Sequence, residues 1–338
     1  MTSVLDSLNT GLRQALAVDE RVILLGEDIL DPYGGAFKVT RGLSSAFPGR
    51  VLTTPISEAG IVGLAAGMAL RGLRPVVEIM FGDFITLTAD QVINHAAKFR
   101  WMYNDQVRVP MVIRTPMGGR RGYGPTHSQS LEKLFLGVPG LRVLAPTHFG
   151  DPGALLKEAI LKSDDPLLFV ENKLLYLLPL QQDGSMLDFD LSEIKISSSH
   201  SPAYRLRLKG APPPNLTIAA YGHMAELTRQ AAQRLAYEHE IFAEIIVPTQ
   251  LAPFAIEPIL ESVRHTRRLL SAEEGTLTLG WGAELVALIS SAQDSNLLAA
   301  DRVAAHDLPV PASGPLEDSV LPNAEEIVQA GIKLIRKS

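Results

Sequence analysis

Short apolar runs alternate with stretches of helical character along the first half of the sequence. The apolar runs are rich in Val, Ile and Leu and end at turn residues: 21–25, 51–54, 74–80, 109–114, 141–145 and 166–170. Stretches of helical length separate them, among them 1–20, 58–70 and 89–103. Continuous apolar strands with helices between them are typical of a parallel sheet covered on both faces. We therefore predict an α/β fold whose ligands bind at the carboxyl ends of the strands.

This pattern stops near residue 178 and resumes near residue 215. Residues 181–201 are polar and irregular, and three consecutive prolines occupy 212–214. Proline cannot continue a helix or an inner strand, so this stretch reads as a connection. A second series of strands and helices then begins with a strand over 216–221. We predict two α/β domains with mainly parallel sheets, over 1–178 and 215–338, joined by a crossover over 179–214.

Composition narrows the classes of function. The 338 residues suit two domains of roughly 150 residues each. A net charge of −6 gives no basic field for a phosphate backbone, which argues against a nucleic-acid partner. The absence of cysteine excludes disulfides, thiolate zinc sites and cysteine nucleophiles. No targeting segment and no apolar run of membrane-spanning length is visible, so we expect a soluble, cytoplasmic protein with no membrane partner.

Glu58 is the first candidate for chemistry. It follows the predicted strand 51–54 and falls in the first turn of a helix that Ser57 can cap. A carboxylate there stabilises the helix dipole by about 0.3–1 kcal/mol, so helix stabilisation alone would account for it. The helix leaves one side almost without bulk, with glycines at 60, 63 and 67. Glycine costs about 1 kcal/mol against alanine inside a helix, which close packing against a partner would offset.

Two other segments could contact a ligand. Residues 117–129 (MGGRRGYGPTHSQ) form a glycine-rich loop that ends near His127, and Arg120 and Arg121 could attract an anion or simply be solvated. An ordinary surface loop is the alternative, and the lysine and hydroxyl of a phosphate-binding P-loop are missing. Met80, Phe81 and Phe84 lie where the strand over 74–80 meets a loop, and there they either join the core or stack on a flat ring.

These segments, taken in order, resemble a known family. The blocks are LGEDILDPYGGAFKVTRGL, TPISEAGIVGLAAGMALRGLRPVVEIMF, DQVINHAAK, GPTHSQS and PGLRVLAP, with GWGAEL and GPLEDSVLPN further on. Together they resemble the β subunit of the E1 component of thiamine-diphosphate-dependent 2-oxo acid dehydrogenases, in the transketolase superfamily. The resemblance covers nearly the whole chain. It implies a pyrimidine-binding domain followed by a transketolase C-terminal domain.

The resemblance also implies roles for individual residues. Glu58 corresponds to the glutamate that hydrogen-bonds N1′ of the aminopyrimidine, a contact that lets the 4′-imine remove the C2 proton. His127 corresponds to a histidine of the substrate channel, which assists proton transfer or reductive acyl transfer to lipoamide. Glu27 and Asp28 correspond to an acidic pair that supports the cofactor site. The remaining cofactor contacts that it implies are apolar: Ile56, Met80, Phe81 and Phe84.

A partner chain is expected from the same resemblance. The Gly-Asp-Gly motif that binds diphosphate and Mg²⁺ is missing, and its nearest match, residues 82–84, has Phe84 in the third position. The diphosphate and Mg²⁺ are therefore expected on an α-type subunit, in an α2β2 heterotetramer. A K⁺ site is expected near Ala159 and Asp164–Asp165.

The leading functional hypothesis is decarboxylation of a 2-oxo acid, pyruvate first, with transfer of the acyl group to lipoamide on a lipoyl domain of an E2 acyltransferase. Branched-chain 2-oxo acids and acetoin remain open as substrates. One alternative is a split transketolase-like carboligase or acyltransferase that uses another acceptor. A second alternative is a non-catalytic subunit for assembly or regulation, against which the retention of both Glu58 and His127 argues.

Overall fold

The computed structural model describes residues 2–181, 186–196 and 201–336, and the chain forms two compact units. The first unit comprises residues 1–117 and 134–180, and the second comprises 118–133 and 181–338. The chain therefore leaves the first unit at Met117, returns to it at Leu134, and leaves it again after Leu180. The loop that carries His127 groups with the second unit, although the strands on either side of it belong to the first.

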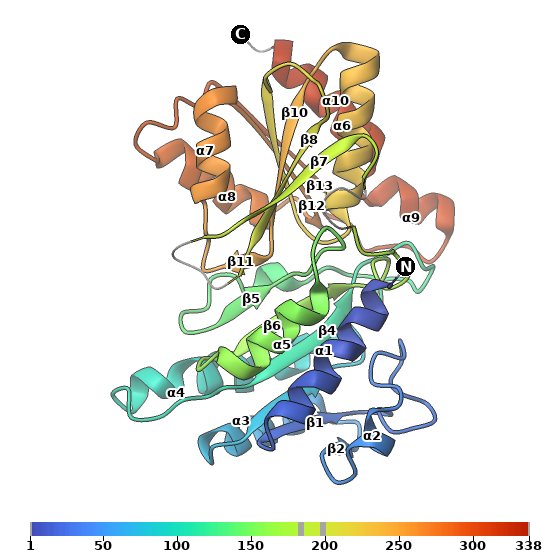
Figure 1. Cartoon of the computed structure of the whole chain (residues 1–338), viewed down its shortest axis with the longest axis vertical. Helices are drawn as coiled ribbons and strands as arrows, with labels where there is room; N and C mark the ends of the chain where they lie inside the picture. The colour runs from blue at the N-terminus through green and yellow to red at the C-terminus, as the bar shows by residue number, and fades with distance from the viewer. Residues whose placement is uncertain (1, 182–185, 197–200, 337–338) are drawn as a thin grey trace. The chain divides into compact units, whose positions relative to one another are not determined.

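A parallel sheet forms the centre of the first unit, as predicted (Figure 1). The spatial order of these strands is β5-β6-β4-β3-β1-β2, and every one of these neighbouring pairs is parallel. Their apolar side chains are buried on both faces because helices cover the sheet. The strands are β1 (Val22–Gly26), β2 (Val51–Thr53), β3 (Arg74–Glu78), β4 (Val112–Met117), β5 (Arg142–Leu144) and β6 (Leu167–Asn172).

Helices α1 (Val4–Val18) and α5 (Pro152–Lys162) pack against each other and share a hydrophobic core with the sheet. Local signals define where they begin: Ser3 and Asp6 form a capping box at α1, and the Asp151 carboxylate caps α5. Helix α3 (Glu58–Leu70) has the predicted bounds and packs against β3. Helix α2 (Leu43–Ala46) is a single turn.

The helix predicted over 89–103 is not one regular α-helix. Residues 82–88 form a 3₁₀-helix, 90–96 form π-helical turns, and only α4 (Ala97–Met102) is α-helical. The side-chain pattern predicts a helix but does not distinguish i+3, i+4 and i+5 hydrogen bonding.

The second unit also contains a six-stranded sheet, in the order β13-β12-β9-β10-β8-β7. Strands β9, β10, β12 and β13 are parallel, whereas β8 pairs antiparallel with β10 and β7 pairs antiparallel with β8. The strands are β7 (Phe189–Ile194), β8 (Ala203–Leu208), β9 (Leu216–Ala220), β10 (Ala243–Pro248), β12 (Arg268–Thr276) and β13 (Ala299–Ala305). The mainly parallel α/β character of both units is thus confirmed.

Strands β7 and β8 lie in the stretch predicted to be an irregular crossover. In β7, Phe189 and Leu191 are buried, whereas Asp190 and Ser192 are exposed. An edge strand with one wet face alternates polar and apolar residues, so it lacks the continuous apolar run by which the other strands were predicted. Part of the predicted crossover, residues 182–185 and 197–200, lies outside the described residues.

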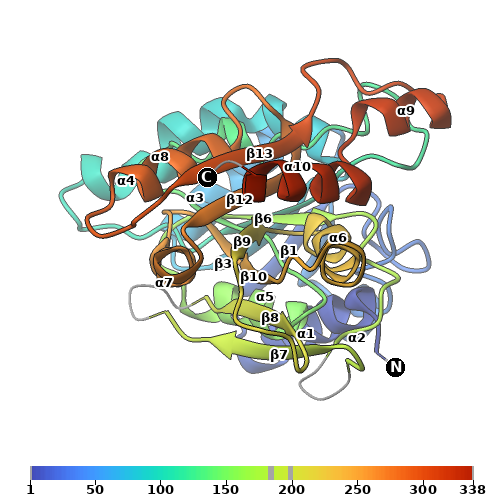
Figure 2. The ribbon, with the colours of Figure 1, turned by 90° about the horizontal axis from the view of Figure 1, so that it is seen from above.

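Two helices cover each side of the second sheet. Helices α6 (Met224–His239) and α10 (Ala324–Arg336) lie on one side, and α7 (Glu257–Thr266) and α8 (Trp281–Ser291) lie on the other (Figures 1 and 2). The short elements β11 (Gln250–Ala252) and α9 (Gly314–Val320) complete the unit. Within the described residues, no helix is both long and apolar enough to cross a bilayer.

The α1–α5 contact depends on two glycines. A Cβ at Gly11 would lie 2.2 Å from the Gly153 carbonyl oxygen, and a Cβ at Gly153 would lie 1.9 Å from the Ser7 carbonyl oxygen. We predict that Gly153→Ala lowers the free energy of unfolding by about 1–3 kcal/mol, because backbone must move to admit the methyl group. Urea denaturation measures this, with Gly137→Ala as control because nothing lies within 4 Å of its Cβ position. Equal midpoints for the two variants would contradict the prediction.

Candidate active site

Three neighbouring strands of the first unit end at the same level. Gly26 at the end of β1 pairs in register with Thr53 of β2 and with Glu78 of β3. The chain leaves the sheet beyond these residues, and the Thr54 N–H donates to the Gly26 carbonyl at 3.1 Å. The segments that carry Glu27, Glu58 and the residues after β3 therefore begin at one carboxyl edge, where parallel sheets bind ligands.

Two buried carboxyl groups lie at this edge. Glu58 is the first residue of α3, and both it and Glu27 are only 7% exposed. Burial raises the pKa of Glu27, and the charge of Glu58 raises it further, while a hydrogen bond from the Ser57 backbone N–H opposes both effects. The Glu27 Oε1 and Thr54 Oγ1 atoms are buried without a hydrogen-bond partner. Buried polar atoms without a partner are rare in folded proteins. The Glu27 oxygen, with Glu58 beside it, is therefore suited to accept a hydrogen bond from a ligand.

The capping role expected for Ser57 is wrong. Ser57 does occupy the N-cap position of α3, but its side chain makes no capping hydrogen bond. Its backbone N–H is instead directed to the Glu27 carboxylate. This contact ties the start of α3 to the end of β1.

The apolar residues that follow β3 begin at the same edge. Met80, Phe81 and Phe84 are each half-buried. The Phe81 ring makes edge-to-face contacts with Phe37, at 5.5 Å between ring centroids, and with Phe84, at 6.0 Å. Ile56, just before α3, is 84% exposed. The structure thus places the predicted apolar contacts after β2 and β3, with Phe81 fixed by other aromatic rings.

A buried ionic network lies within the sheet itself, and sequence reasoning missed it. The Arg114 guanidinium donates to Glu171 through Nε at 2.9 Å and Nη2 at 2.7 Å, and it also donates to Glu78. The Tyr176 hydroxyl donates to Glu171 at 2.6 Å. Burial raises the pKa of Glu78, while the Arg114 charge opposes that shift. A charged residue inside each of three apolar strands is the signal that could have predicted this network.

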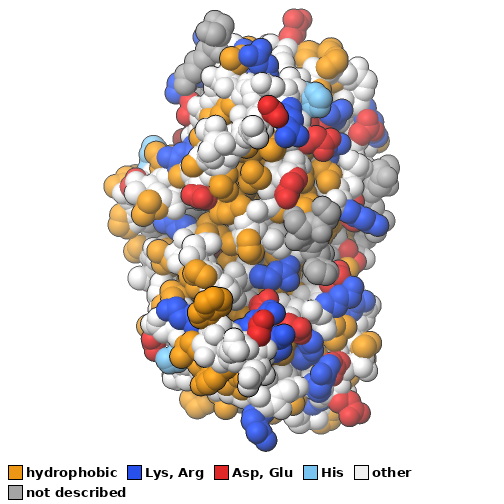
Figure 3. Space-filling model, turned by 90° about the vertical axis from the view of Figure 1, so that its left-hand side faces the viewer, with side chains coloured by type: hydrophobic (Ala, Val, Ile, Leu, Met, Phe, Trp, Pro, Cys, Tyr) orange, Lys and Arg blue, Asp and Glu red, His pale blue; other side chains and the backbone are white. Residues whose placement is uncertain are grey.

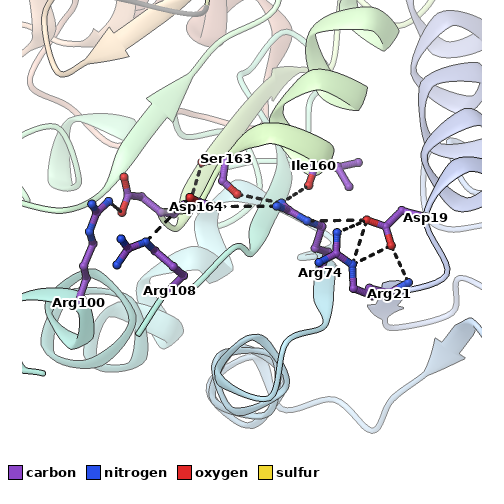
Figure 4. A network of polar contacts seen from close by, with 9 residues as sticks. Asp19, Arg21, Arg74, Arg100, Arg108, Ile160, Ser163 and Asp164 are labelled. Atoms are coloured by element: carbon purple, nitrogen blue, oxygen red, sulfur yellow. Dashed lines mark hydrogen bonds and ion pairs between the residues drawn. The ribbon is translucent and has the colours of Figure 1, made fainter. Parts of the chain in front are cut away.

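The predicted K⁺ site corresponds to the C-terminal end of α5. There Arg74 Nη1 donates to the Ile160 carbonyl at 2.8 Å and to the Ser163 carbonyl at 2.9 Å (Figure 4). The Ala159 carbonyl accepts from the Ser163 N–H at 3.2 Å. Burial lowers the pKa of the Arg74 guanidinium, which Asp164 partly offsets. The Arg74 guanidinium therefore already binds the Ile160 and Ser163 carbonyls. K⁺ binding near Ala159 and Asp164 stays a prediction.

His127 lies on the loop of the second unit and is half-buried. Its backbone N–H donates to the Gly124 carbonyl at 3.2 Å, and its Nδ1 is 3.0 Å from the Thr126 hydroxyl. Arg120, considered above as an attractor of anions, hydrogen-bonds the Pro322 carbonyl. Glu58 and the apolar contacts thus belong to the first unit, and His127 belongs to the second.

A second group of buried acids lies in the second unit. Glu273 is fully buried and accepts the N–H groups of Trp281 at 2.7 Å and Gly282 at 2.8 Å, at the start of α8. Burial raises the pKa of Glu273 to about 7, and the neighbouring charge of Glu132 adds to the shift. Glu132 is itself buried and accepts a hydrogen bond from the Tyr221 hydroxyl. Among the described residues, no group of three or more His, Cys, Asp or Glu side chains is placed to hold a metal ion.

Comparison with known families assigns both parts of the chain. The family "Transketolase, pyrimidine binding domain" matches residues 2–178, and "Transketolase, C-terminal domain" matches residues 208–327. The β-1 subunit of the mitochondrial pyruvate dehydrogenase E1 component of Arabidopsis thaliana is 38% identical over 99% of this chain and 90% of its own length. The chain belongs to the E1 β-subunit family of thiamine-diphosphate-dependent 2-oxo acid dehydrogenases.

Other members of this E1 β-subunit family differ in the activity that their names give. The pyruvate dehydrogenase E1 β subunit of Leifsonia xyli is 38% identical over 96% of this chain and 91% of its own length. The β subunit of the acetoin:2,6-dichlorophenolindophenol oxidoreductase of Bacillus subtilis is 34% identical over 98% of this chain and 97% of its own. A solved structure described as a split-gene transketolase, inactive beta4 tetramer, shares the fold, with a TM-score of 0.76 and 20% identity over 100% of this chain and 99% of its own.

Ionisation of Glu273 predicts a pH dependence of stability. Because its pKa is raised from 4.5 to about 7 in the folded protein, the folded state holds this proton more tightly than the unfolded state. The resulting stabilisation is complete below pH 4.5 and is lost as the pH rises through 7. We predict that the free energy of unfolding, taken relative to Glu273→Gln, falls by about 2 kcal/mol between pH 5 and pH 7.5.

Urea denaturation at the two pH values measures this difference, with the exposed Glu284→Gln as control. A difference between wild type and Glu273→Gln that does not change with pH would contradict it.

Proposed function

We propose that this chain is the β subunit of a thiamine-diphosphate-dependent E1 enzyme that decarboxylates a 2-oxo acid, pyruvate first, and transfers the acyl group to lipoamide. The observation that carries the proposal is the buried pair Glu27 and Glu58, with an unsatisfied Glu27 oxygen, at the carboxyl edge of β1 and β2. The names of relatives at 34–38% identity over nearly the whole chain support it.

The residues at this edge fit the aminopyrimidine of the cofactor. The ring presents nitrogen donors and acceptors, which a buried carboxyl pair can satisfy, and a flat apolar face, which the half-buried side chains after β3 can cover. When bound, thiamine diphosphate supplies an acidic ring carbon and an electron sink for the decarboxylation. Glu58 would hold the proton at pyrimidine N1′, and Met80, Phe81, Phe84 and Ile56 would exclude water from the ring.

Glu27 would support Glu58 in this role. Glu27 is buried beside it, and burial together with the charge of Glu58 raises the pKa of Glu27, so the two carboxyl groups interact directly. The hydrogen bond from the Ser57 N–H to Glu27 also fixes the first turn of α3, on which Glu58 lies. His127 would give or take a proton during acyl transfer, because an imidazole ring has one nitrogen that can donate a proton and one that can accept it.

The proposal assigns the diphosphate and Mg²⁺ to an α-type subunit in an α2β2 heterotetramer, with a lipoyl domain of an E2 acyltransferase as acceptor. A K⁺ ion is not included, because Arg74 already occupies the Ile160 and Ser163 carbonyls. The cytoplasmic location stays a prediction, and several relatives from plants and yeast are named as mitochondrial.

The name of the Bacillus subtilis relative favours oxidation of acetoin as a second candidate function. Co-expression with an α-type subunit, addition of thiamine diphosphate and Mg²⁺, and assays on pyruvate, branched-chain 2-oxo acids and acetoin would separate the two. Ferricyanide, a lipoyl domain and an aldehyde serve in turn as acceptor. Product only with the aldehyde would establish the carboligase alternative, and no turnover with any acceptor would establish the non-catalytic one.

Glu58→Gln tests the site directly. We predict that the assembled enzyme loses activity by about 100-fold or more, because an amide cannot hold the proton that the carboxyl group holds. Steady-state assays with ferricyanide measure this loss. Glu20→Gln is the matched control, since it makes the same chemical change at an exposed glutamate that precedes β1, at the other end of the strand. Full activity in Glu58→Gln would sink the assignment.

Assembly with the α-type subunit can be tested on α3. Its exposed side carries Gly60, Gly63 and Gly67, and nothing lies within 4 Å of a Cβ placed at Gly67. Apolar side chains are also exposed elsewhere on the surface, and Figure 3 shows such side chains lying among charged ones on one face of the molecule. We predict that Gly67→Leu folds normally but no longer forms the heterotetramer, because bulk would prevent close helix approach. Native mass spectrometry measures assembly, with the exposed Gly137→Leu as control.

A further inference from the structure

The backbone N–H groups at the start of the His127 loop are bound by two carboxylates of the same unit. The Gly119 N–H donates to Glu274 Oε1 at 2.8 Å. The Arg120 N–H donates to Glu317 Oε1 at 2.7 Å, and the Gly122 N–H donates to Glu317 Oε2 at 3.1 Å. Each oxygen of Glu317 therefore accepts from a different residue of the loop.

Both carboxylates are fixed and nearly inaccessible. Glu317 is 3% exposed and comes from α9, whereas Glu274 is 6% exposed and comes from β12. The Ser130 hydroxyl also donates to Glu274, at 3.3 Å, so this carboxylate binds the loop at both ends. Backbone N–H groups that converge in this way form an anion-binding concavity, and here the anion is a side chain of the chain itself.

The loop has little conformational preference of its own. Gly118, Gly122 and Gly124 have φ values of 98°, 67° and 77°, and Arg120 has a φ of 63°, which is uncommon outside glycine. A non-glycine residue persists in this region only where its surroundings hold it. Arg120 is held by residues of a single segment, through the Glu317 carboxylate and the Pro322 carbonyl.

This fixed segment leads directly to His127. Gly124 packs against Ala312, with a built Cβ 3.4 Å from the Ala312 Cβ, and its carbonyl accepts the His127 N–H. The His127 side chain therefore extends from a backbone turn. Glu317 and Glu274 hold the loop residues that come just before this turn. We propose that Glu317, together with Glu274, is a positioning residue for His127, which holds the loop in the conformation used in acyl transfer. This inference rests on the function proposed for His127.

The isosteric variant Glu317→Gln tests the first half of the proposal. A glutamine can accept a hydrogen bond from one of the two N–H groups but presents its own NH2 to the other, so the loop should open. We expect amide hydrogen exchange in peptides that cover residues 118–124 to accelerate about tenfold, the usual effect of losing a charge-assisted hydrogen bond. Tryptic cleavage after Arg120 and Arg121 should accelerate in parallel.

Asp318→Asn is the matched control, because Asp318 neighbours Glu317 on α9 but its side chain is 75% exposed and lies 3.8 Å from Arg120. This variant should keep the wild-type exchange rate. Glu274→Gln is the second variant and should release Gly119 in the same way. Wild-type exchange rates in both Glu317→Gln and Glu274→Gln would overturn the proposal.

The second half is tested in the assembled enzyme. We expect Glu317→Gln to lower kcat with a lipoyl domain about tenfold while the rate with ferricyanide, which does not require acyl transfer, stays within twofold of wild type. A purely structural defect would lower both rates together, and that result would overturn the positioning role. If His127→Ala transfers acyl groups at the full rate, the function proposed for His127 fails, whereas faster exchange in Glu317→Gln would still show that the carboxylate holds the loop.

Discussion

Parallel pairing of β1 with both β2 and β3 is the constraint on which the candidate site depends. A parallel strand must be reached by a crossover, so consecutive strands all end at the same edge, and Gly26 is in register with the last residues of both neighbours. Glu27 and Glu58 are brought together by this register. The strands are apolar and are therefore buried on both faces of the sheet. The same burial removes water from the two carboxyl groups, and this raises the pKa of Glu27. The parallel, apolar strands therefore determine both the position of the two carboxyl groups and the raised pKa of Glu27.

Much of this architecture could be predicted from the sequence, because its signals are local. Continuous Val, Ile and Leu runs predicted β1 to β6, and the bounds of α3 were predicted to the residue. The edge strands β7 and β8 were missed because an alternating, half-exposed strand resembles a polar linker. Glu58 and the residues after β3 could be named as candidates from their place at strand ends. The pairing of Glu317 and Glu274 with the loop could not, since it joins segments far apart in sequence without a repeating pattern.

Two segments whose sequence suggests ion binding are bound instead by charged side chains of the same chain. The C-terminal end of α5 has carbonyls oriented for a cation, and the Arg74 guanidinium binds two of them. The glycine-rich loop has N–H groups oriented for an anion, and the Glu317 carboxylate binds two of them. In both places the local backbone correctly indicates the sign of the charge that binds. Only the tertiary structure shows that the charge is internal, whereas the unsatisfied oxygen of Glu27 leaves the carboxyl edge of β1 open to a ligand.

The path of the chain bears on how this protein can be divided. The region that matches the pyrimidine-binding family runs over residues 2–178, yet residues 118–133 within it belong to the second unit. A fragment cut at that family boundary would contain His127 but would lack Glu274 and Glu317, which bind the loop leading to it. The two modules are therefore not interchangeable parts: exchanging either one between relatives would separate the loop that leads to His127 from the carboxylates that accept its backbone N–H groups.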